Sequence, residues 1–430
     1  MRYPLLVRIA VVALIGAGLV FPLSLIKGKV SERRERADAV QKSFVAEAGG
    51  AQVVAGPFLT LCEPPAVDGG SVSCATRVVA PRFVEVKGTL SVEQRYRGIY
   101  PVRLYRGELT FSGEFEVPPD DAASRWRVAY LTVAVSDPRG IKNASIVAAG
   151  ATRTRFAPGA RGGALSSGLH ARLGALQALG KDGPMPFRFT VEFTGTSRLE
   201  IAPVGDSSDI QLASKWSHPS LIGAFVADER EVSAAGFAAR WRINEFATGG
   251  AAYWREFAAG GQASAGPRAV GVSLVEPINI YSLSYRAIEY GFLFVLFTFV
   301  AFVLVELVCG VTLHPVQYAF VGLALAVFFL LLVALSEHID FASAYLAAAL
   351  ACVTLLTYYL RHPLETWLRT SAFAALFSAL YGSLYFLLKS EDHALLLGSL
   401  LVFAALATAM LLTRRLDWNA LSRRLAPQAG

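Results

Sequence analysis

Residues 288–309, IEYGFLFVLFTFVAFVLVELVC, form an apolar stretch long enough to cross a lipid bilayer. A bilayer core needs about 20 predominantly apolar residues per helix. Four similar stretches follow after short polar breaks, and one more lies near the N-terminus. The predicted spans are residues 5–26, 288–309, 316–335, 341–360, 370–388 and 394–413. The chain is therefore predicted to be a multi-pass membrane protein.

The composition agrees with this prediction. The 430 residues are 54% hydrophobic and only 17% charged, whereas charged residues make up about 25% of a typical soluble protein. The net charge of +7 does not indicate nucleic-acid binding. Many of the basic residues are arginines at the membrane rim, where topology and anionic lipid account for them. The lipid bilayer is the expected partner of the apolar stretches.

The distribution of Lys and Arg in the short flanks predicts the orientation. One set of short loops, residues 336–340 and 389–393, contains Lys389 alone. The other set of flanks contains Arg2, Arg8, Arg361, Arg369, Arg414, Arg415, Arg423 and Arg424. Because basic flanks stay inside, both termini are predicted to be cytoplasmic, with the long domain outside, which is the periplasm if the cell has two membranes. A conflicting basic run follows the first span, but long domains translocate largely regardless of charge.

The chain divides by composition into five parts. They are an N-terminal anchor (1–26), an amphipathic helix (27–48), a β-rich periplasmic domain (49–286), a five-helix bundle (287–413) and a cytoplasmic tail (414–430). The first span resembles a signal peptide in position. However, its apolar run exceeds the usual ~7–15 residues, and no obvious small-x-small cleavage site follows it. We therefore favour an uncleaved anchor.

Residues 49–286 alternate between apolar and polar with a period of two. Such alternation predicts strands with one buried and one wet face, as in antiparallel sheets. It is clearest at residues 84–92, 108–117, 187–193 and 237–244. We expect a sandwich or a long curved sheet. Residues 148–183 are weakly patterned, and we expect them to form a surface loop with one short helix at 164–179.

Two cysteines lie in the predicted periplasmic domain. Cys62 and Cys74 flank a turn-rich segment, and an oxidising compartment would favour a disulfide between them. Two free thiols are the alternative.

The turn between the third and fourth spans carries ionisable residues. Glu337, His338 and Asp340 lie there, and ionisable groups at a membrane are candidate functional residues. A histidine can change charge between about pH 5 and 8, which suits a sensor. The alternative is an interfacial turn in which Ser336 or Asp340 caps a helix and the charges face water.

Trp216 and His218 form a second candidate site in an expected loop of the β-rich domain. They could stack on a glycan, but such a pair more often holds a loop against a sheet. We find no metal-ligand spacing, nucleophile motif or phosphate loop. Neither a cofactor nor an enzymatic activity is therefore expected.

The fifth span carries small residues at four-residue spacing: Ser371, Ala375, Ala379 and Ser383. Such a stripe lets helices approach closely. We expect it to pack inside the bundle, and a seam between two copies of the chain is the alternative.

Several segments together resemble the CreD family. They are GAQ (50–52), GPF (56–58), SKWSHPSLIG (214–223), GFAARW (236–241), FATGG (246–250), EPINIY (276–281), RAIEYG (286–291), LHPVQY (313–318) and SEHI (336–339). The resemblance extends over residues 10–415. It implies a bacterial inner-membrane protein with a large periplasmic domain and a role in envelope stress, and it supplies no catalytic residues. The Cys62 and Cys74 pair departs from the family pattern.

Two functions follow as hypotheses. In the first, the periplasmic domain binds an envelope ligand or partner, and the membrane part anchors it or relays the binding. In the second, the protein is a transporter or a lipid-handling protein with a path through the bundle. The first is preferred, because no Asp, Glu, Lys, Arg or His lies at the centre of any span.

Overall fold

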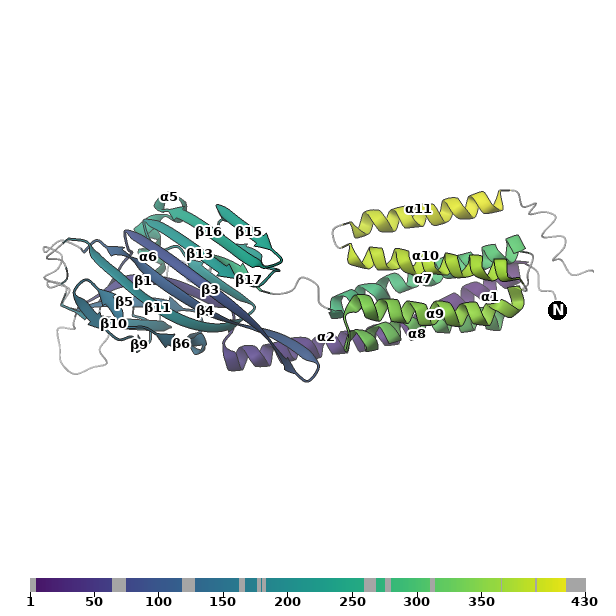
Figure 1. The fold of residues 1–430 in the computed structure, drawn as a ribbon, viewed down its shortest axis with the longest axis horizontal. Helices are drawn as coiled ribbons and strands as arrows, with labels where there is room; N and C mark the ends of the chain where they lie inside the picture. Colours follow the sequence, from purple (N-terminus) through teal and green to yellow (C-terminus); the bar gives the residue numbers. More distant parts are fainter. Residues whose placement is uncertain are drawn as a thin grey trace, which may run out of the picture. The chain divides into compact units, whose positions relative to one another are not determined.

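The computed structural model describes residues 5–63, 75–117, 128–161, 167–175, 179, 183–258, 268–274, 280–309, 314–364, 366–390 and 393–414. The chain forms two compact units (Figure 1). The helical unit comprises residues 1–38 and 277–430, and the β unit comprises residues 39–276. The division falls within one helix, after Asp38.

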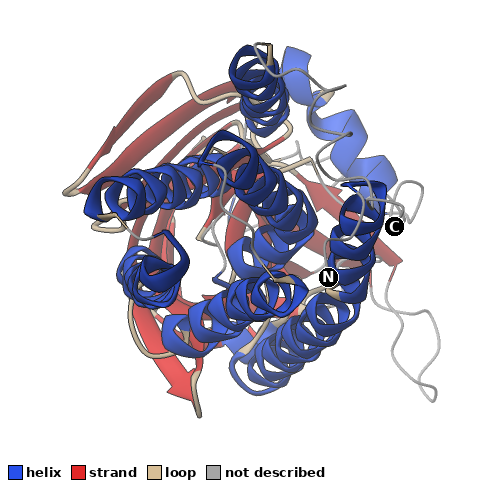
Figure 2. Ribbon diagram, turned by 90° about the vertical axis from the view of Figure 1, so that its right-hand side faces the viewer, coloured by secondary structure: helices blue, strands red, loops and turns tan. Residues whose placement is uncertain are grey.

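The helical unit is built from helices that pack side by side, most of them long and apolar (Figure 2). They are α1 (Leu5–Gly18), α2 (Val20–Ala48), α7 (Ile280–Cys309), α8 (Pro315–Ser336), α9 (Phe341–Leu364), α10 (Trp367–Lys389) and α11 (Ala394–Thr413). α2 begins in this unit and ends in the β unit. Among the described residues, six helices are long and apolar enough to span a membrane, and the first of them, Ala10–Glu47, combines parts of α1 and α2. His314 caps α8, because its side chain accepts a hydrogen bond from the Val316 amide.

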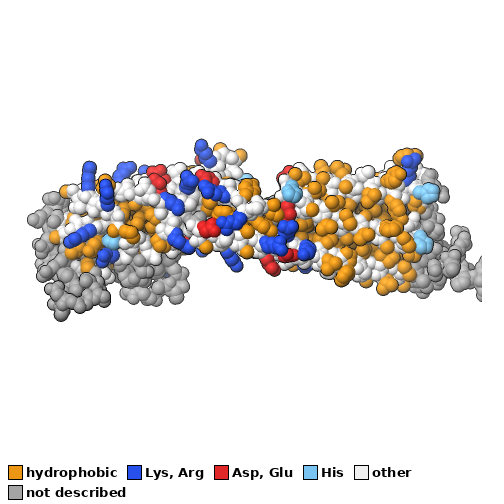
Figure 3. Space-filling view, turned by 90° about the horizontal axis from the view of Figure 1, so that it is seen from below, with side chains coloured by type: hydrophobic (Ala, Val, Ile, Leu, Met, Phe, Trp, Pro, Cys, Tyr) orange, Lys and Arg blue, Asp and Glu red, His pale blue; other side chains and the backbone are white. Residues whose placement is uncertain are grey.

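Aromatic side chains fill the core of the helical unit. Phe294 and Phe328 each lie 4.8 Å from Tyr381 between ring centroids, and Phe302 lies 5.0 Å from Phe373. The outer surface is also apolar, and hydrophobic side chains cover most of its visible face (Figure 3). An exposed apolar surface of this extent marks a membrane-facing region.

The β unit contains two sheets. Among the described residues, the first sheet comprises β1 (Gln52–Glu63), β2 (Ala75–Val79), β5 (Val128–Val135), β9 (Ala157–Pro158), β10 (Gly168–Gly174), β12 (Arg198–Ala202), β14 (Ser220–Gly223) and β17 (Val270–Ser273). Its order is β14-β17-β12-β1-β5-β10-β9, and β2 pairs with β1. Most pairs are antiparallel, but β1 and β12 run parallel.

The second sheet comprises β3 (Phe83–Arg97), β4 (Tyr100–Phe115), β6 (Ile141–Ala144), β7 (Val147–Ala149), β8 (Thr152–Thr154), β11 (Met185–Thr196), β13 (Ser207–Ser214), β15 (Glu229–Ser233) and β16 (Gly236–Asn244). Its order is β15-β16-β13-β3-β4-β11-β7-β8, with β6 paired to β11. Again most pairs are antiparallel, and β13 pairs with β3 in parallel. The four predicted strands are confirmed: three lie within β3, β11 and β16, and the fourth coincides with β4 up to Phe115, two residues short of its predicted end.

One hydrophobic core lies between the two sheets, with buried residues from both. The β unit is therefore a sandwich, and the predicted fold class is confirmed: a helical membrane part with a β-rich domain rich in antiparallel pairs. Two short helices, α5 (Glu245–Thr248) and α6 (Gly250–Ala258), accompany the sheets. Trp254 of α6 is buried against Phe58 of β1, with ring centroids 5.1 Å apart.

The predicted helix at residues 164–179 is wrong. Residues 168–174 form β10, between β5 and β9. Leu169, Ala171 and Leu173 are buried, whereas Arg172 between them is exposed. This two-residue period is that of a strand. Only three alternations are present, and the Gly- and Ala-rich surroundings hide them in the sequence.

Candidate functional site

The turn between α8 and α9 holds the first predicted site, and the structure separates its members. His338 and Asp340 are exposed. The Asp340 carboxylate accepts a hydrogen bond from the Ser343 amide at 3.0 Å, as a helix cap does. This bond lowers the pKa of Asp340. Asp340 therefore has the capping geometry, and a sensing role for His338 stays a prediction.

Glu337 lies in a different environment from its two neighbours. Its side chain is only 11% exposed, and its Oε1 lies 3.5 Å from Nε of Arg33 on α2. A second ion pair, Lys27 with Glu289 at 3.2 Å, also connects α2 to the bundle. The structure thus pairs Glu337 with Arg33, which was not among the predicted site residues.

Trp216 and His218 lie in the segment between β13 and β14. The Trp216 indole donates a hydrogen bond to the His218 carbonyl at 3.0 Å, and His218 Nδ1 lies 2.8 Å from the Ser217 hydroxyl. The guanidinium of Arg103 lies over the Trp216 ring at 5.0 Å. These contacts are mostly within the loop itself, and Trp216 also packs against the sandwich core. Ligand binding at this pair stays a prediction.

Two further predictions concern cysteines and small residues. Cys62, at the end of β1, is disulfide-bonded. Its predicted partner Cys74 lies outside the described residues, so the pairing stays a prediction. On α10, Ser371, Ala375 and Ala379 are exposed, and the buried face carries aromatic and leucine side chains instead. The expectation that this stripe packs inside the bundle is therefore wrong.

The end of α2 in the β unit is held by a polar cluster around Arg139. Arg139 Nη1 donates to the Ala46 carbonyl at 2.6 Å, and Asp137 accepts from the Gly50 amide at 3.2 Å. Two further bonds join Arg139 to Asp137, at 2.9 and 2.7 Å. A cation at a helix C-terminus satisfies free carbonyls and stabilises the dipole. We name Asp137, Arg139, Ala46 and Gly50 the helix clamp.

The Arg139 guanidinium and the Gly50 amide hold the pKa of Asp137 at about 2. A lowered carboxyl pKa stabilises the folded state above the unfolded value of about 3.9 and loses this effect as pH falls toward 2. Asp137→Asn should therefore lower stability at pH 7 by about 1 kcal/mol, after allowance for solvent screening. Thermal unfolding between pH 2 and 7 checks this, and a variant with the wild-type pH profile would contradict it.

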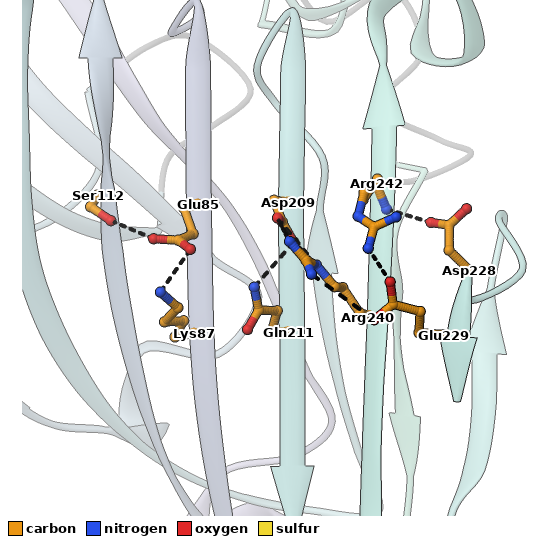
Figure 4. Close-up of polar contacts among 9 residues, drawn as sticks. All are labelled: Glu85, Lys87, Ser112, Asp209, Gln211, Asp228, Glu229, Arg240 and Arg242. Atoms are coloured by element: carbon orange, nitrogen blue, oxygen red, sulfur yellow. Dashed lines mark hydrogen bonds and ion pairs between the residues drawn. The ribbon is translucent and has the colours of Figure 1, made fainter. Parts of the chain in front are cut away.

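The outer face of the second sheet carries a network of ion pairs (Figure 4). Lys87 pairs with Glu85 at 2.7 Å, and Arg240 donates to both oxygens of Asp209, at 2.9 Å to Oδ1 and 2.6 Å to Oδ2. Arg242 pairs with Glu229. The bond from Arg240 lowers the pKa of Asp209. The network spans β3, β13, β16 and β15. The charged side chains in it already have partners of opposite charge on this face.

A groove runs beside this network. One hollow of about 490 Å³ lies over β3, β13, β16 and β15. A second, of about 740 Å³, lies over β3, β4 and β11 and reaches Phe44 and Glu47 of α2. Thr89 lines both hollows. We name the two together the sheet groove. The described residues include no group of three or more His, Cys, Asp or Glu placed to hold a metal ion.

A β-sandwich attached to apolar helices of membrane-spanning length defines a multi-pass membrane protein with a large domain outside the bilayer. The chain matches the family described as "Inner membrane protein CreD" over residues 4–419. It belongs to the CreD family of inner membrane proteins, as the sequence resemblance predicted. Its relative "Inner membrane protein CreD" from Escherichia coli (strain K12) is 30% identical over 426 residues, covering 94% of this chain and 91% of the relative.

Similarities to solved structures are much weaker. A crystal structure of a mutant M1 zinc metallopeptidase from Deinococcus radiodurans is 9% identical, with a TM-score of 0.21 and 38% of each chain covered. Another crystal structure of an M1 zinc metallopeptidase from the same organism is 10% identical, with a TM-score of 0.20 and the same coverage. Scores this low carry no argument about fold or function.

Proposed function

We propose that this protein acts in the integrity and stress response of the bacterial cell envelope. Its β-sandwich binds an envelope ligand or partner, and its six apolar helices anchor the sandwich in the inner membrane. The observation that carries the proposal is membership of the CreD family over residues 4–419, in a chain that joins a large β unit to six apolar helices. The role proposed is binding and anchoring, not catalysis.

The proposed orientation places both termini in the cytoplasm and the β unit in the periplasm. Arg361, Arg369 and Arg414 flank the helices on the proposed cytoplasmic side, and Lys389 is on the other. This asymmetry supports the orientation. The disulfide at Cys62 also supports it, because structural disulfides persist in the periplasm and are rare in the cytosol.

Anchoring is preferred over transport because the described buried side chains of the helical unit are apolar or uncharged. Its core is made of Phe, Leu, Val, Ala and Tyr. Among the described residues of this unit, the buried polar ones are Ser284, Thr298, Ser336 and Thr370, and none carries a formal charge. Ion-coupled transporters generally place charged groups or broken helices near the midplane.

Binding is preferred over catalysis because of how the charges of the β unit are arranged. In the outer-face network, Lys87, Arg240 and Arg242 each pair with a neighbour on the sheet. These charges are spread over four strands and do not converge on one reacting position. Such a surface suits recognition of an extended ligand.

Cysteine labelling in cells tests the orientation. Val226 in the β unit is 92% exposed, so Val226→Cys should react with a membrane-impermeant maleimide once the outer membrane is permeabilised. A cysteine added after Gly430 should react only after the inner membrane is disrupted. The unmodified chain gives the background. Labelling of both sites only after disruption would overturn the periplasmic placement.

Complementation tests the envelope role. A strain lacking the gene should be more sensitive to detergents and cell-wall antibiotics, and the full-length chain should restore resistance. The variant Glu337→Gln/His338→Ala, at matched membrane levels, tests whether the outer turn takes part. Loss of rescue would favour a relay or a path through the bundle, and unchanged sensitivity of the deletion strain would remove the envelope role.

A further inference from the structure

A row of six side chains crosses the outer face of the second sheet, one from each neighbouring strand. The pairings of β15, β16, β13, β3, β4 and β11 place these residues directly opposite one another. In order they are Glu231, Ala238, Ala213, Thr89, Glu108 and Glu192. We name them the Thr89 row. The side chains at the centre of the row are small, and those at its two ends are glutamates.

The Thr89 row lies along the floor of the sheet groove. Glu231, Ala238, Ala213 and Thr89 contribute to the 490 Å³ hollow, and Thr89, Glu108 and Glu192 contribute to the 740 Å³ hollow. Alanine and threonine leave space above the sheet, and the two hollows meet at Thr89, so that together they follow the row. The groove therefore has the shape for an extended ligand that crosses the strands.

The acidic ends of the row lack partners of opposite charge. Glu108 lies directly opposite Glu192, an arrangement that destabilises a sheet. In the part of the chain that the structure describes, no ion pair is formed by Glu108, Glu192 or Glu231. The closest polar contact is from Asn143 Nδ2 to Glu192 at 3.5 Å. Local rules of this kind are broken mainly at functional sites.

Most cations of the groove are already neutralised. Lys87 pairs with Glu85 and Arg240 with Asp209, whereas Arg95 and Arg106 share Glu93, at 3.5 and 3.7 Å. Lys142 and Arg230 also line the groove. The row itself therefore keeps three unpaired carboxylates. Four strand spacings of ~4.8 Å separate Glu231 from Glu108, or about 19 Å.

We propose that the Thr89 row binds an extended peptide that carries two basic side chains. One basic group lies between Glu108 and Glu192, and the other reaches Glu231. An extended chain rises ~3.3 Å per residue, so basic residues six positions apart match the ~19 Å spacing. The Thr89 hydroxyl and the Gln211 amide offer hydrogen bonds to the peptide backbone. The inference rests on the proposed function, because it names the ligand class of the β unit.

The test uses full-length protein in nanodiscs and a fluorescent seven-residue peptide with lysine at both ends and serine and alanine between. Fluorescence anisotropy at low salt should show saturable binding. Glu108→Gln/Glu192→Gln should weaken binding at least tenfold, and Glu231→Gln severalfold. Glu114→Gln is the matched control, because Glu114 lies on the same face of β4 outside the groove. It should leave the affinity unchanged.

Equal affinity of wild type and the Glu108/Glu192 variant would overturn the proposal, as would equal binding of the peptide with acetylated lysines. The double substitution removes a like-charge repulsion, so its unfolding temperature should not fall. If the double variant nevertheless fails to fold, the peptide affinity of Glu231→Gln tests the proposal by itself, and an unchanged affinity overturns it. If cysteine labelling and complementation gave the expected results but the peptide did not bind, this inference would be overturned and the proposed function would stand. Failed labelling or rescue would overturn the proposed function.

Discussion

Phe58→Ala is expected to lower the free energy of unfolding of the β unit by about 3–5 kcal/mol. Phe58 lies on β1 and has no exposed surface. Its ring packs against Trp254 at 5.1 Å, so truncation leaves a cavity between the sheet and α6. The cost is the lost burial of the ring together with the lost contacts of the cavity wall. Hydrogen exchange of β1 and β5 amides in the full-length protein, over a urea series, measures it.

Phe246→Ala is the matched control for this substitution. Phe246, on α5 of the same unit, is 89% exposed, so the same chemical change there should alter stability by less than about 0.5 kcal/mol. If the two variants unfolded at the same urea concentration, Phe58 would not occupy the core of a sandwich. A large loss confined to Phe58→Ala supports the two-sheet architecture.

The same strand shows why only part of the β unit could be predicted from the sequence. β3, β4, β11 and β16 each have one wet face, and their alternation was visible. β1 is buried on both faces, and a continuous apolar run cannot be distinguished from a buried helix by its period. The central strand of the first sheet was therefore not identified. The helices of the membrane part were predictable because their length and hydrophobicity are local properties.

The candidate sites depended on contacts that are distant in sequence. The Thr89 row requires β3 to pair with β13 in parallel, which places Thr89 opposite Ala213. No local pattern specifies that register. The helix clamp likewise joins Arg139 to Ala46. Glu337 is unusual in the sequence because it lies at the end of an apolar span, but its partner Arg33 is one member of a basic run on α2.

Glu337→Arg is expected to destabilise the helical unit by about 2–3 kcal/mol. The Glu337 side chain is 11% exposed and that of Arg33 is 41% exposed, so the substitution places two cations together at a site largely shielded from water. Breaking a fully buried pair costs about 3–5 kcal/mol, and the exposure of Arg33 reduces this. Thermal unfolding of the full-length protein in detergent measures the loss.

A variant in which the two charges are exchanged distinguishes loss of the ion pair from a steric effect of the larger arginine side chain. Arg33→Glu/Glu337→Arg restores opposite charges and should recover at least half of the lost stability, which a double-mutant cycle expresses as a coupling energy. Glu289→Lys is the control, because Lys27 and Glu289 are 41% and 48% exposed and an exposed pair contributes less than about 1 kcal/mol. No recovery in the exchanged variant would mean that the two side chains do not interact. Recovery would establish that this ion pair joins α2 to the α8–α9 turn.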